Sequence, residues 1–186
     1  DSHPEWLVQF AVMGSAYMRA MTGKEEPRVA LLNVGTEDHK GNTLLRETYP
    51  LLKSSDLNFV GNMEARDTLT GKYDVVVCDG YDGNVLLKGS EGAAKMVMKA
   101  LKNAIMSSLS AKIGYLFMKK AFSKLRRDMD YNNYGGGVFL GTKKPVIKAH
   151  GSSNAAAIKQ CVNQLISIRR GNVYDVIRKG IDDSAK

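Results

Sequence analysis

Three short polar loops carry the residue types that could bind an anion and stabilise a developing negative charge. They read GTEDHKGN at residues 35–42, CDGYDGN at residues 78–84 and KAHGSSN at residues 148–154. Each loop combines glycine with small polar residues and stands between a short apolar run and a segment of helical periodicity. Glycine lets the backbone approach a ligand, and the N–H groups at the start of the next helix favour an anion. The pattern therefore predicts an anion-binding site.

Individual side chains in these loops suit separate tasks. Lys40 supplies a point charge suited to a phosphate oxygen. Gly83 and Asn84 end the second loop, and the Asn84 amide can donate to an oxyanion. The third loop offers neutral donors around another helix start, namely His150, Ser152 and Ser153. The same residue types are also ordinary in turns and helix caps, so each loop taken singly has a structural alternative.

Several motifs of cofactor and metal chemistry do not occur in the sequence. There is no P-loop, no Gly-x-Gly-x-x-Gly fingerprint, no HExxH and no Cys-x-x-Cys pair, so we expect neither a metal nor a cofactor. Cys78 and Cys161 are the only cysteines, and both are expected in the core instead of acting as nucleophiles. Two cysteines without framework spacing, beside nine methionines, indicate a reducing compartment and hence a cytoplasmic protein.

The three loops are positioned by the segments between them, in which expected strands alternate with expected helices. This order predicts an α/β fold with a mostly parallel sheet in a single domain over residues 1–186. Ligands bind outside the carboxyl ends of parallel strands, so we expect all three loops at one edge of one sheet. The glycine run at residues 135–137 predicts a loop. We expect strands at 28–34, 57–62, 73–80 and 145–151, and helices at 4–21, 41–53, 83–106, 115–128, 152–168 and 172–180.

The positive charge of the chain lies in one segment. The net charge is +8, yet Lys88 to Arg127 alone carries +9, from eight lysines, two arginines and one glutamate. We expect residues 103–128 to form an amphipathic helical hairpin, because apolar and basic side chains separate onto opposite arcs there. Such helices bind anionic membrane surfaces. The residues assigned to this membrane contact are Phe117, Met118, Phe122, Lys119, Lys120 and Lys124.

Two other interpretations of the basic segment stay open. The apolar arc could belong to a helix packed into a dimer core, with a solvated basic face. The helices could also serve a non-enzymatic module that binds nucleic acid or protein. Nucleic acid is disfavoured, because the aromatic residues lie on the apolar arc and not between the charges. No run of eighteen apolar residues occurs, so no span of a membrane is expected.

Six sequence blocks, in order, resemble the signatures of the bacterial phosphate acyltransferase family (PlsX). The blocks extend from about residue 5 to about residue 160 and read LVQFAVMGS, LLNVGTEDHKGN, NFVGNMEARD, DVVVCDGYDGNVLLK, YGGGVFLG and PVIKAHGSSNAAAIK. Members of this family also have an N-terminal half with a Gly-Asp-rich loop after its first strand. We therefore expect this chain to correspond to the C-terminal portion of such a protein.

The resemblance implies a three-layer α/β/α sandwich, similar to isopropylmalate dehydrogenases and phosphotransacetylases, with a protruding basic helical hairpin. It implies transfer of a fatty acyl group from acyl carrier protein to inorganic phosphate, which forms an acyl phosphate for phospholipid synthesis. It further implies that the transfer uses no metal or nucleotide. Together with the basic segment, the resemblance leads us to expect a cytoplasmic homodimer that touches anionic membranes reversibly. A phosphotransacetylase-like enzyme that takes acyl-CoA is the alternative within the same chemistry.

The resemblance also implies roles for loop residues. Lys40 would hold phosphate, Asn84 and the Gly83 N–H would polarise the thioester carbonyl, and Asp79 would orient its neighbours. The expected substrate-binding residues are Gly35, Thr36, Glu37, Gly41, Asn42, Gly83, His150, Gly151, Ser152 and Ser153.

Overall fold

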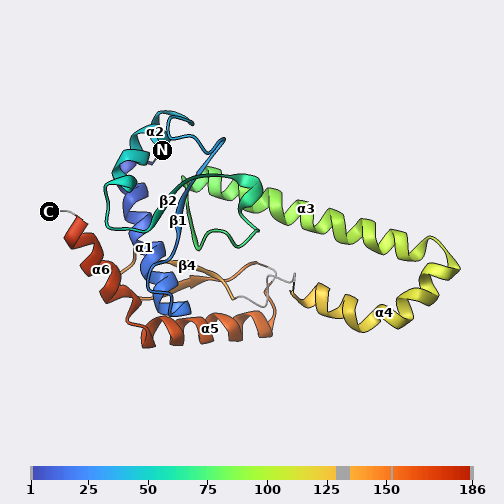
Figure 1. The fold of residues 1–186 in the computed structure, drawn as a ribbon. Coiled ribbons are helices and arrows are strands. Elements are labelled where there is room, and N and C mark those ends of the chain that lie inside the picture. Colours follow the sequence, from blue (N-terminus) through green and yellow to red (C-terminus); the bar gives the residue numbers. More distant parts are fainter. Residues whose placement is uncertain (1, 129–134, 152, 185–186) are drawn as a thin grey trace.

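The computed structural model describes residues 2–128, 135–151 and 153–184 (Figure 1). A parallel three-stranded sheet forms its centre, in the order β2-β1-β3. β1 (Val29–Asn33) pairs with β2 (Phe59–Glu64) on one side and with β3 (Val75–Val77) on the other. The aliphatic run at the start of β1 is fully buried, as expected of a middle strand covered on both faces. The α/β class predicted from the sequence is confirmed.

Two helices of the first half pack on this sheet. α1 (Pro4–Thr22) has proline in its first turn and ends at Gly23, which adopts a left-handed conformation. α2 (Thr43–Lys53) begins after Asn42, whose side chain accepts a hydrogen bond from the Leu45 N–H at 3.0 Å. Leu7 and Leu52, one from each helix, are fully buried in the same apolar cluster as β1 and β3.

The last part of the chain, from residue 137 onward, forms a smaller layer against the other side of α1. It consists of β4 (Gly137–Phe139), β5 (Val146–Lys148), α5 (Ala155–Arg170) and α6 (Val173–Ser184). A second apolar cluster joins the later part of α1 to α5 and α6. Side chains of α1 therefore contribute to both apolar clusters, and α1 lies between the parallel sheet and the smaller layer (Figure 1).

The late strand does not extend the parallel sheet, and that expectation was wrong. β5 pairs antiparallel with β4 in a separate sheet, and β4 includes part of the glycine run that was expected to be a loop. Only residues 140–145 connect the two strands, which is too short for the crossover that a parallel pair needs. Glycine permits the close approach, because a Cβ on Gly136 would lie 2.5 Å from the Lys148 carbonyl oxygen.

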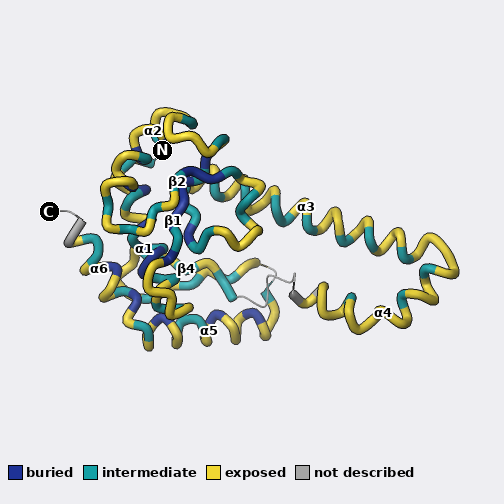
Figure 2. The backbone as a smooth tube through the Cα atoms, in the orientation of Figure 1, coloured by how far each residue is buried: buried dark blue, intermediate teal, exposed yellow. Residues whose placement is uncertain are grey.

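Two long helices project together from this body. α3 (Gly80–Met106) and α4 (Leu109–Asp128) lie side by side, and their outer surfaces are mostly exposed (Figures 1 and 2). The turn between them falls at Ser107 and Ser108, within residues 103–128, where a helical hairpin was expected. α4 starts six residues earlier than the expected 115. Within the described residues, no helix carries an apolar stretch long enough to cross a bilayer.

Candidate active site

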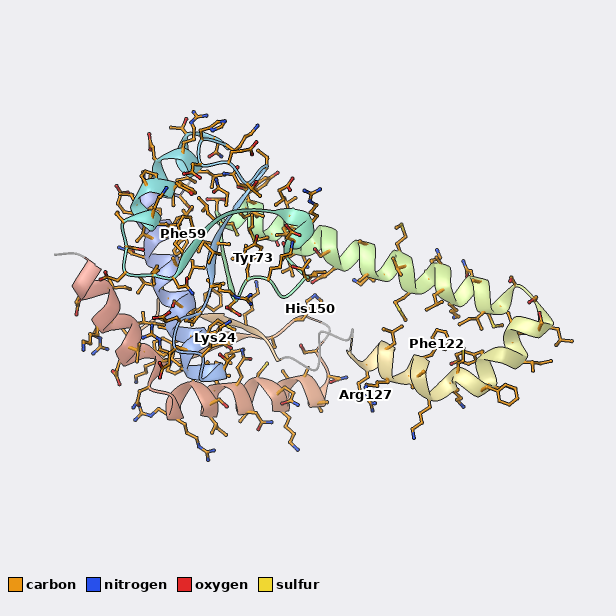
Figure 3. All side chains as sticks on the ribbon, in the orientation of Figure 1. Lys24, Phe59, Tyr73, Phe122, Arg127 and His150 are labelled. Carbon is orange, nitrogen blue, oxygen red and sulfur yellow. The ribbon has the colours of Figure 1, made fainter. Side chains whose placement is uncertain are left out.

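The loops after β1 and β3 leave the parallel sheet at the same edge. Leu31 lies opposite Val77 in the parallel register, so residues 34–42 and 78–84 start from neighbouring carboxyl ends. The third loop follows β5 in the other sheet, so the expectation that all three loops share one edge of one sheet was wrong. In the view of Figure 3, His150 lies on the side of the body that faces the projecting helices.

The first loop is attached to the sheet by two buried asparagines. Asn33 ends β1 and is 6% exposed; its Nδ2 donates to the Lys40 carbonyl oxygen at 3.0 Å. Asn62 in β2 is 4% exposed, and its Nδ2 donates to the Glu37 carbonyl oxygen at 2.8 Å. The Lys40 N–H also donates to the Glu37 carbonyl oxygen at 3.1 Å, which closes a turn between the two attachments. Neither asparagine was predicted as a site residue from the sequence.

The end of the first loop depends on glycine. Gly41 has a φ of +94°, and a Cβ there would lie 2.7 Å from the Asn33 Oδ1. The Gly41 carbonyl oxygen accepts a hydrogen bond from Arg46 Nη1 at 2.9 Å, which brings a second cation to the loop. Gly41 and Asn42, both predicted as site residues, thus shape the loop and start the following helix.

Lys40 and Glu37 lie on the outer side of this loop. Their side chains are 43% and 55% exposed, and Lys40 Nζ is 3.9 Å from Glu37 Oε1. Gly35 lies beneath both, because a Cβ there would meet Glu37 Oε2 at 2.7 Å and Lys40 Cγ at 3.2 Å. Thr36 is exposed beside them. A long, solvated ion pair of this kind is weak, so the Lys40 ammonium can bind an incoming anion.

Asp38 ties the outer side of the same loop to α2. Its carboxylate accepts hydrogen bonds from Tyr49 Oη at 2.7 Å and from Lys53 Nζ at 3.2 Å. The Tyr49 hydrogen bond, followed by that of Lys53, lowers the pKa of Asp38. The same carboxylate raises the pKa of Tyr49 to about 12. The acid in the loop and the tyrosine in the helix were visible in the sequence, but their contact depends on where α2 packs.

Asp79 in the second loop is a helix cap. Its Oδ1 accepts a hydrogen bond from the Tyr81 N–H at 2.7 Å, and its Oδ2 accepts one from Ser2 Oγ at 2.6 Å. The Ser2 hydrogen bond, and then the Tyr81 one, lower the pKa of Asp79. A carboxylate held in its charged form by these donors is a poor base, and its expected role in orienting its neighbours stays a prediction.

Gly83 and Asn84 lie in the first turn of α3. The Gly83 N–H already donates to the Asp79 carbonyl oxygen at 2.9 Å. That N–H was expected to polarise a carbonyl, and this part of the expectation is corrected, because its hydrogen bond is used within the helix. The Asn84 side chain is exposed and has no hydrogen-bond partner among the described residues, so its amide stays available to a ligand.

The expected core placement holds for Cys161 only, because Cys78 is half-buried just after β3. Burial, and then the carboxylates of Asp82 and Asp79, raise the pKa of Cys78. A thiol kept neutral in this way is a weak nucleophile. Cys161 in α5 is buried in the second layer.

The third loop leads into α5. The Ser153 N–H donates to the His150 carbonyl oxygen at 3.0 Å, and the Asn154 side chain caps the helix by accepting from the Ala157 N–H at 3.0 Å. Ser153 Oγ is buried without a hydrogen-bond partner among the described residues. His150 and Gly151 are exposed. Ser152 lies outside the residues that the structure describes.

Acidic, histidine and cysteine side chains do not gather anywhere in the described part of the chain in a group that could hold a metal ion. Three cations lie near the first loop: Lys40, Arg46, and Lys53, which is paired with Asp38. The exposed amide of Asn84 lies after the neighbouring strand. This donor set suits an oxyanion.

The projecting helices form a second candidate surface. A groove of about 720 Å³ runs between α3 and α4, and it is lined by Met98, Lys99, Leu101, Lys102, Ile105, Met106, Lys112, Tyr115, Leu116, Phe122 and Ser123. Phe122 packs against Tyr115 at 5.5 Å between ring centroids, so it faces the groove. Phe117, by contrast, is 87% exposed. Leu109, Ile113 and Leu116 continue an exposed apolar stripe along α4 with Phe117.

Comparisons with known proteins all find relatives of one kind. The model of a family described as "Fatty acid synthesis protein" matches residues 1–175. A phosphate acyltransferase of Clostridium acetobutylicum is 46% identical over 183 residues, which cover 98% of this chain and 55% of the relative. The phosphate acyltransferases of Brevibacillus brevis and Bacillus pumilus are 49% and 50% identical over 181 residues, which cover 97% of this chain and 54% of each relative. This chain thus spans about half the length of the curated relatives it matches. It belongs to the fatty acid synthesis protein family.

Proposed function

We propose that the full-length protein transfers a fatty acyl group from acyl carrier protein to inorganic phosphate and releases an acyl phosphate for phospholipid synthesis. The observation that carries this proposal is the match of nearly the whole chain to phosphate acyltransferases. The exposed Lys40 and Asn84 lie in loops at neighbouring carboxyl ends of the parallel sheet, which suits phosphate and thioester.

The reaction balances without a metal or a nucleotide. An oxygen of hydrogenphosphate attacks the thioester carbonyl carbon, and the carbonyl oxygen takes the negative charge. The Asn84 amide donates to this oxyanion, while Lys40 holds the charge of the phosphate. The carbon–sulfur bond then breaks, and the proton of hydrogenphosphate ends on the departing sulfur. Phosphate supplies the nucleophile, so no side chain has to form a covalent intermediate.

The remaining predicted residues take supporting places in this proposal. Gly35, Thr36, Glu37, Gly41 and Asn42 form the phosphate loop around Lys40. Asp79 orients the start of α3. In the third loop His150, Gly151, Ser152 and Ser153 supply neutral donors from the other sheet.

The architecture proposed for the whole protein is the three-layer α/β/α sandwich of isopropylmalate dehydrogenases and phosphotransacetylases. The three-stranded parallel sheet and the helices packed on it support this proposal. Residues 1–186 would form one α/β domain, with residues 103–128 as an inserted hairpin. The protein would be a homodimer in the cytoplasm.

The projecting helices are proposed to place the enzyme reversibly on an anionic membrane. Its product carries an acyl chain that is insoluble in water, so release at a bilayer shortens the exposure of the acyl phosphate to hydrolysis. The exposed apolar stripe of α4, which ends at Phe117, and the neighbouring exposed Met118 would enter the interface, while Lys119, Lys120 and Lys124 would meet anionic head groups. Phe122 was grouped with these residues, but it is half-buried against Tyr115, which gives it a smaller share of the contact.

Two measurements on the full-length protein separate this proposal from its alternatives. Phosphate-dependent loss of acyl-carrier-protein thioester, faster than loss of acyl-CoA at equal concentration, supports the proposed donor. The opposite order favours the phosphotransacetylase-like alternative. Binding to anionic vesicles that weakens with salt, without binding to DNA of equal charge, separates a membrane-docking enzyme from a nucleic-acid-binding module.

A further inference from the structure

We propose that Asn33 and Asn62 are positioning residues that hold the Lys40 loop in the shape needed to bind phosphate. The inference rests on the proposed function, since it concerns the phosphate loop of that reaction. It assigns a task to two side chains that are not themselves expected to touch substrate.

The two asparagines hold the loop from neighbouring strands. Asn33 ends β1, and Asn62 lies in β2, where it pairs with Leu31. Their Nδ2 groups donate to the carbonyl oxygens of Lys40 at 3.0 Å and of Glu37 at 2.8 Å. The two attachment points are three residues apart, at the two ends of the turn that the Lys40 N–H closes. The backbone of Lys40 is therefore fixed directly to the sheet.

The other side-chain attachments of the loop, from Arg46 to the Gly41 carbonyl oxygen and from Tyr49 and Lys53 to Asp38, lie at the surface. The Lys40 and Glu37 side chains are about half exposed, at 43% and 55%, and are not part of the buried apolar clusters. On the outer side the Asp38 carboxylate is tied to α2, but that attachment lies at the solvent surface. Groups that bind a reacting molecule lose much of their effect when they shift by about 1 Å. Removing a buried attachment should therefore weaken phosphate binding before it disturbs the rest of the protein.

The hydrogen bond that Asn62 donates explains why an asparagine, and not an apolar residue, occupies this buried position. Its Oδ1 is buried without a hydrogen-bond partner among the described residues. An unpaired buried oxygen costs stability, so an apolar side chain would serve the core better at this position. What an apolar residue cannot supply is the N–H that reaches the Glu37 carbonyl oxygen.

Asn62→Asp in the full-length enzyme tests the inference, because it keeps the shape and removes the donor at neutral pH. Asn58→Asp is the matched control. Asn58 precedes the same strand at its opposite end, and its Nδ2 donates to the Glu26 carbonyl oxygen at 3.1 Å on the surface. At about pH 8 we expect Asn62→Asp to raise the KM for phosphate by about 10–100-fold, with the KM for the thioester donor unchanged. Asn58→Asp should leave both constants at the wild-type values.

The pH profile separates positioning from a general loss of stability. Burial and the nearby carbonyl oxygen should raise the pKa of the new carboxyl group. Once protonated it regains a donor, so the phosphate KM of Asn62→Asp should fall back toward wild type as the pH is lowered to about 6. Asn33→Asp is the second variant, and it should raise the phosphate KM in the same way.

Three results would overturn the inference. The first is a phosphate KM of Asn62→Asp that equals the phosphate KM of Asn58→Asp at every pH. The second is failure of both Asn62→Asp and Asn33→Asp to fold, which would assign the asparagines to the fold alone. The third is a wild-type enzyme without phosphate-dependent turnover, which would remove the proposed function as well and is recognised by the equal inactivity of Asn58→Asp.

Discussion

Asp74 joins the starts of β1 and β3, and replacing it should destabilise the protein without touching the proposed site. Its Oδ2 accepts hydrogen bonds from the Arg28 N–H at 2.8 Å, from Arg28 Nε at 2.9 Å and from Lys24 Nζ at 2.6 Å. The Arg28 guanidinium also donates to the Gly71 carbonyl oxygen at 2.9 Å. The Asp74 side chain is only 14% exposed. It lies at the end of the sheet opposite the Lys40 loop, so its replacement should not disturb the proposed site.

The structure sets the size of the expected effect. Asp74→Ala removes a charged acceptor from a backbone N–H, a hydrogen bond worth about 1.5–3 kcal/mol. The ion pairs add little, because the Lys24 and Arg28 side chains are 42% and 38% exposed and screened by water. We therefore expect Asp74→Ala to lower the free energy of unfolding by about 1–3 kcal/mol at neutral pH.

The difference in free energy of unfolding between wild type and Asp74→Ala should become smaller at acidic pH. The hydrogen bonds from Arg28, and then from Lys24, lower the pKa of Asp74 in the folded protein. An aspartate with a lowered folded pKa contributes its full stability above its unfolded pKa of about 3.9, and loses it as the pH falls through the folded pKa. The gap in stability between wild type and Asp74→Ala should therefore narrow below about pH 4.

Urea unfolding of the full-length protein, at neutral pH and near pH 3.5, measures this gap. Asp67→Ala is the control, since Asp67 makes one surface ion pair with Lys72 at 3.2 Å, and it should cost less than about 0.5 kcal/mol. Equal stability of Asp74→Ala and Asp67→Ala would refute the reasoning, as would a gap that stays constant across this pH range.

Three further predictions concern the proposed site and the membrane, all for the full-length protein. Lys40→Ala should raise the phosphate KM and leave the KM for the thioester donor unchanged; an unaltered phosphate KM would exclude Lys40 from the site. Asn84→Ala should lower kcat by about 10²–10³-fold at unchanged Tm, and a smaller loss than tenfold would remove its role as oxyanion donor. Leu116→Glu with Phe117→Glu should abolish sedimentation with anionic vesicles while Tm is kept, since both side chains are exposed at 68% and 87%; retained sedimentation would show that α4 is not the anchor. Leu69→Glu, another exposed leucine at 83%, is the matched control and should bind vesicles as wild type does.

The sequence predicted the elements of the first half well, because their signals are local. The aliphatic run of β1 and the Asn42 cap of α2 follow from residue type and spacing alone. The order of strands also placed the Lys40 and Asn84 loops at one edge, since parallel strands share the direction of their carboxyl ends.

The parts that the sequence did not predict depend on contacts between distant segments. The glycine run before Val138 looks like a loop, yet Gly137 begins β4 and pairs with Lys148, and the neighbouring Gly136 permits the close approach to the Lys148 carbonyl oxygen. The attachment of Asn62 to the Glu37 carbonyl oxygen joins residues 25 apart in sequence, through a strand pairing that periodicity does not reveal. The Gly83 N–H likewise was assigned to a ligand because the first turn of α3 begins three residues earlier than expected.

The central claim is that the full-length protein uses inorganic phosphate to cleave a fatty acyl thioester of acyl carrier protein. The most direct measurement follows thioester loss and free thiol release, with and without phosphate, and identifies the acyl product by trapping it with hydroxylamine. We expect thiol release that saturates with phosphate and yields one acyl hydroxamate for each thiol. Thioester loss at the same rate without phosphate, or release of free fatty acid as the initial product, would contradict the proposal.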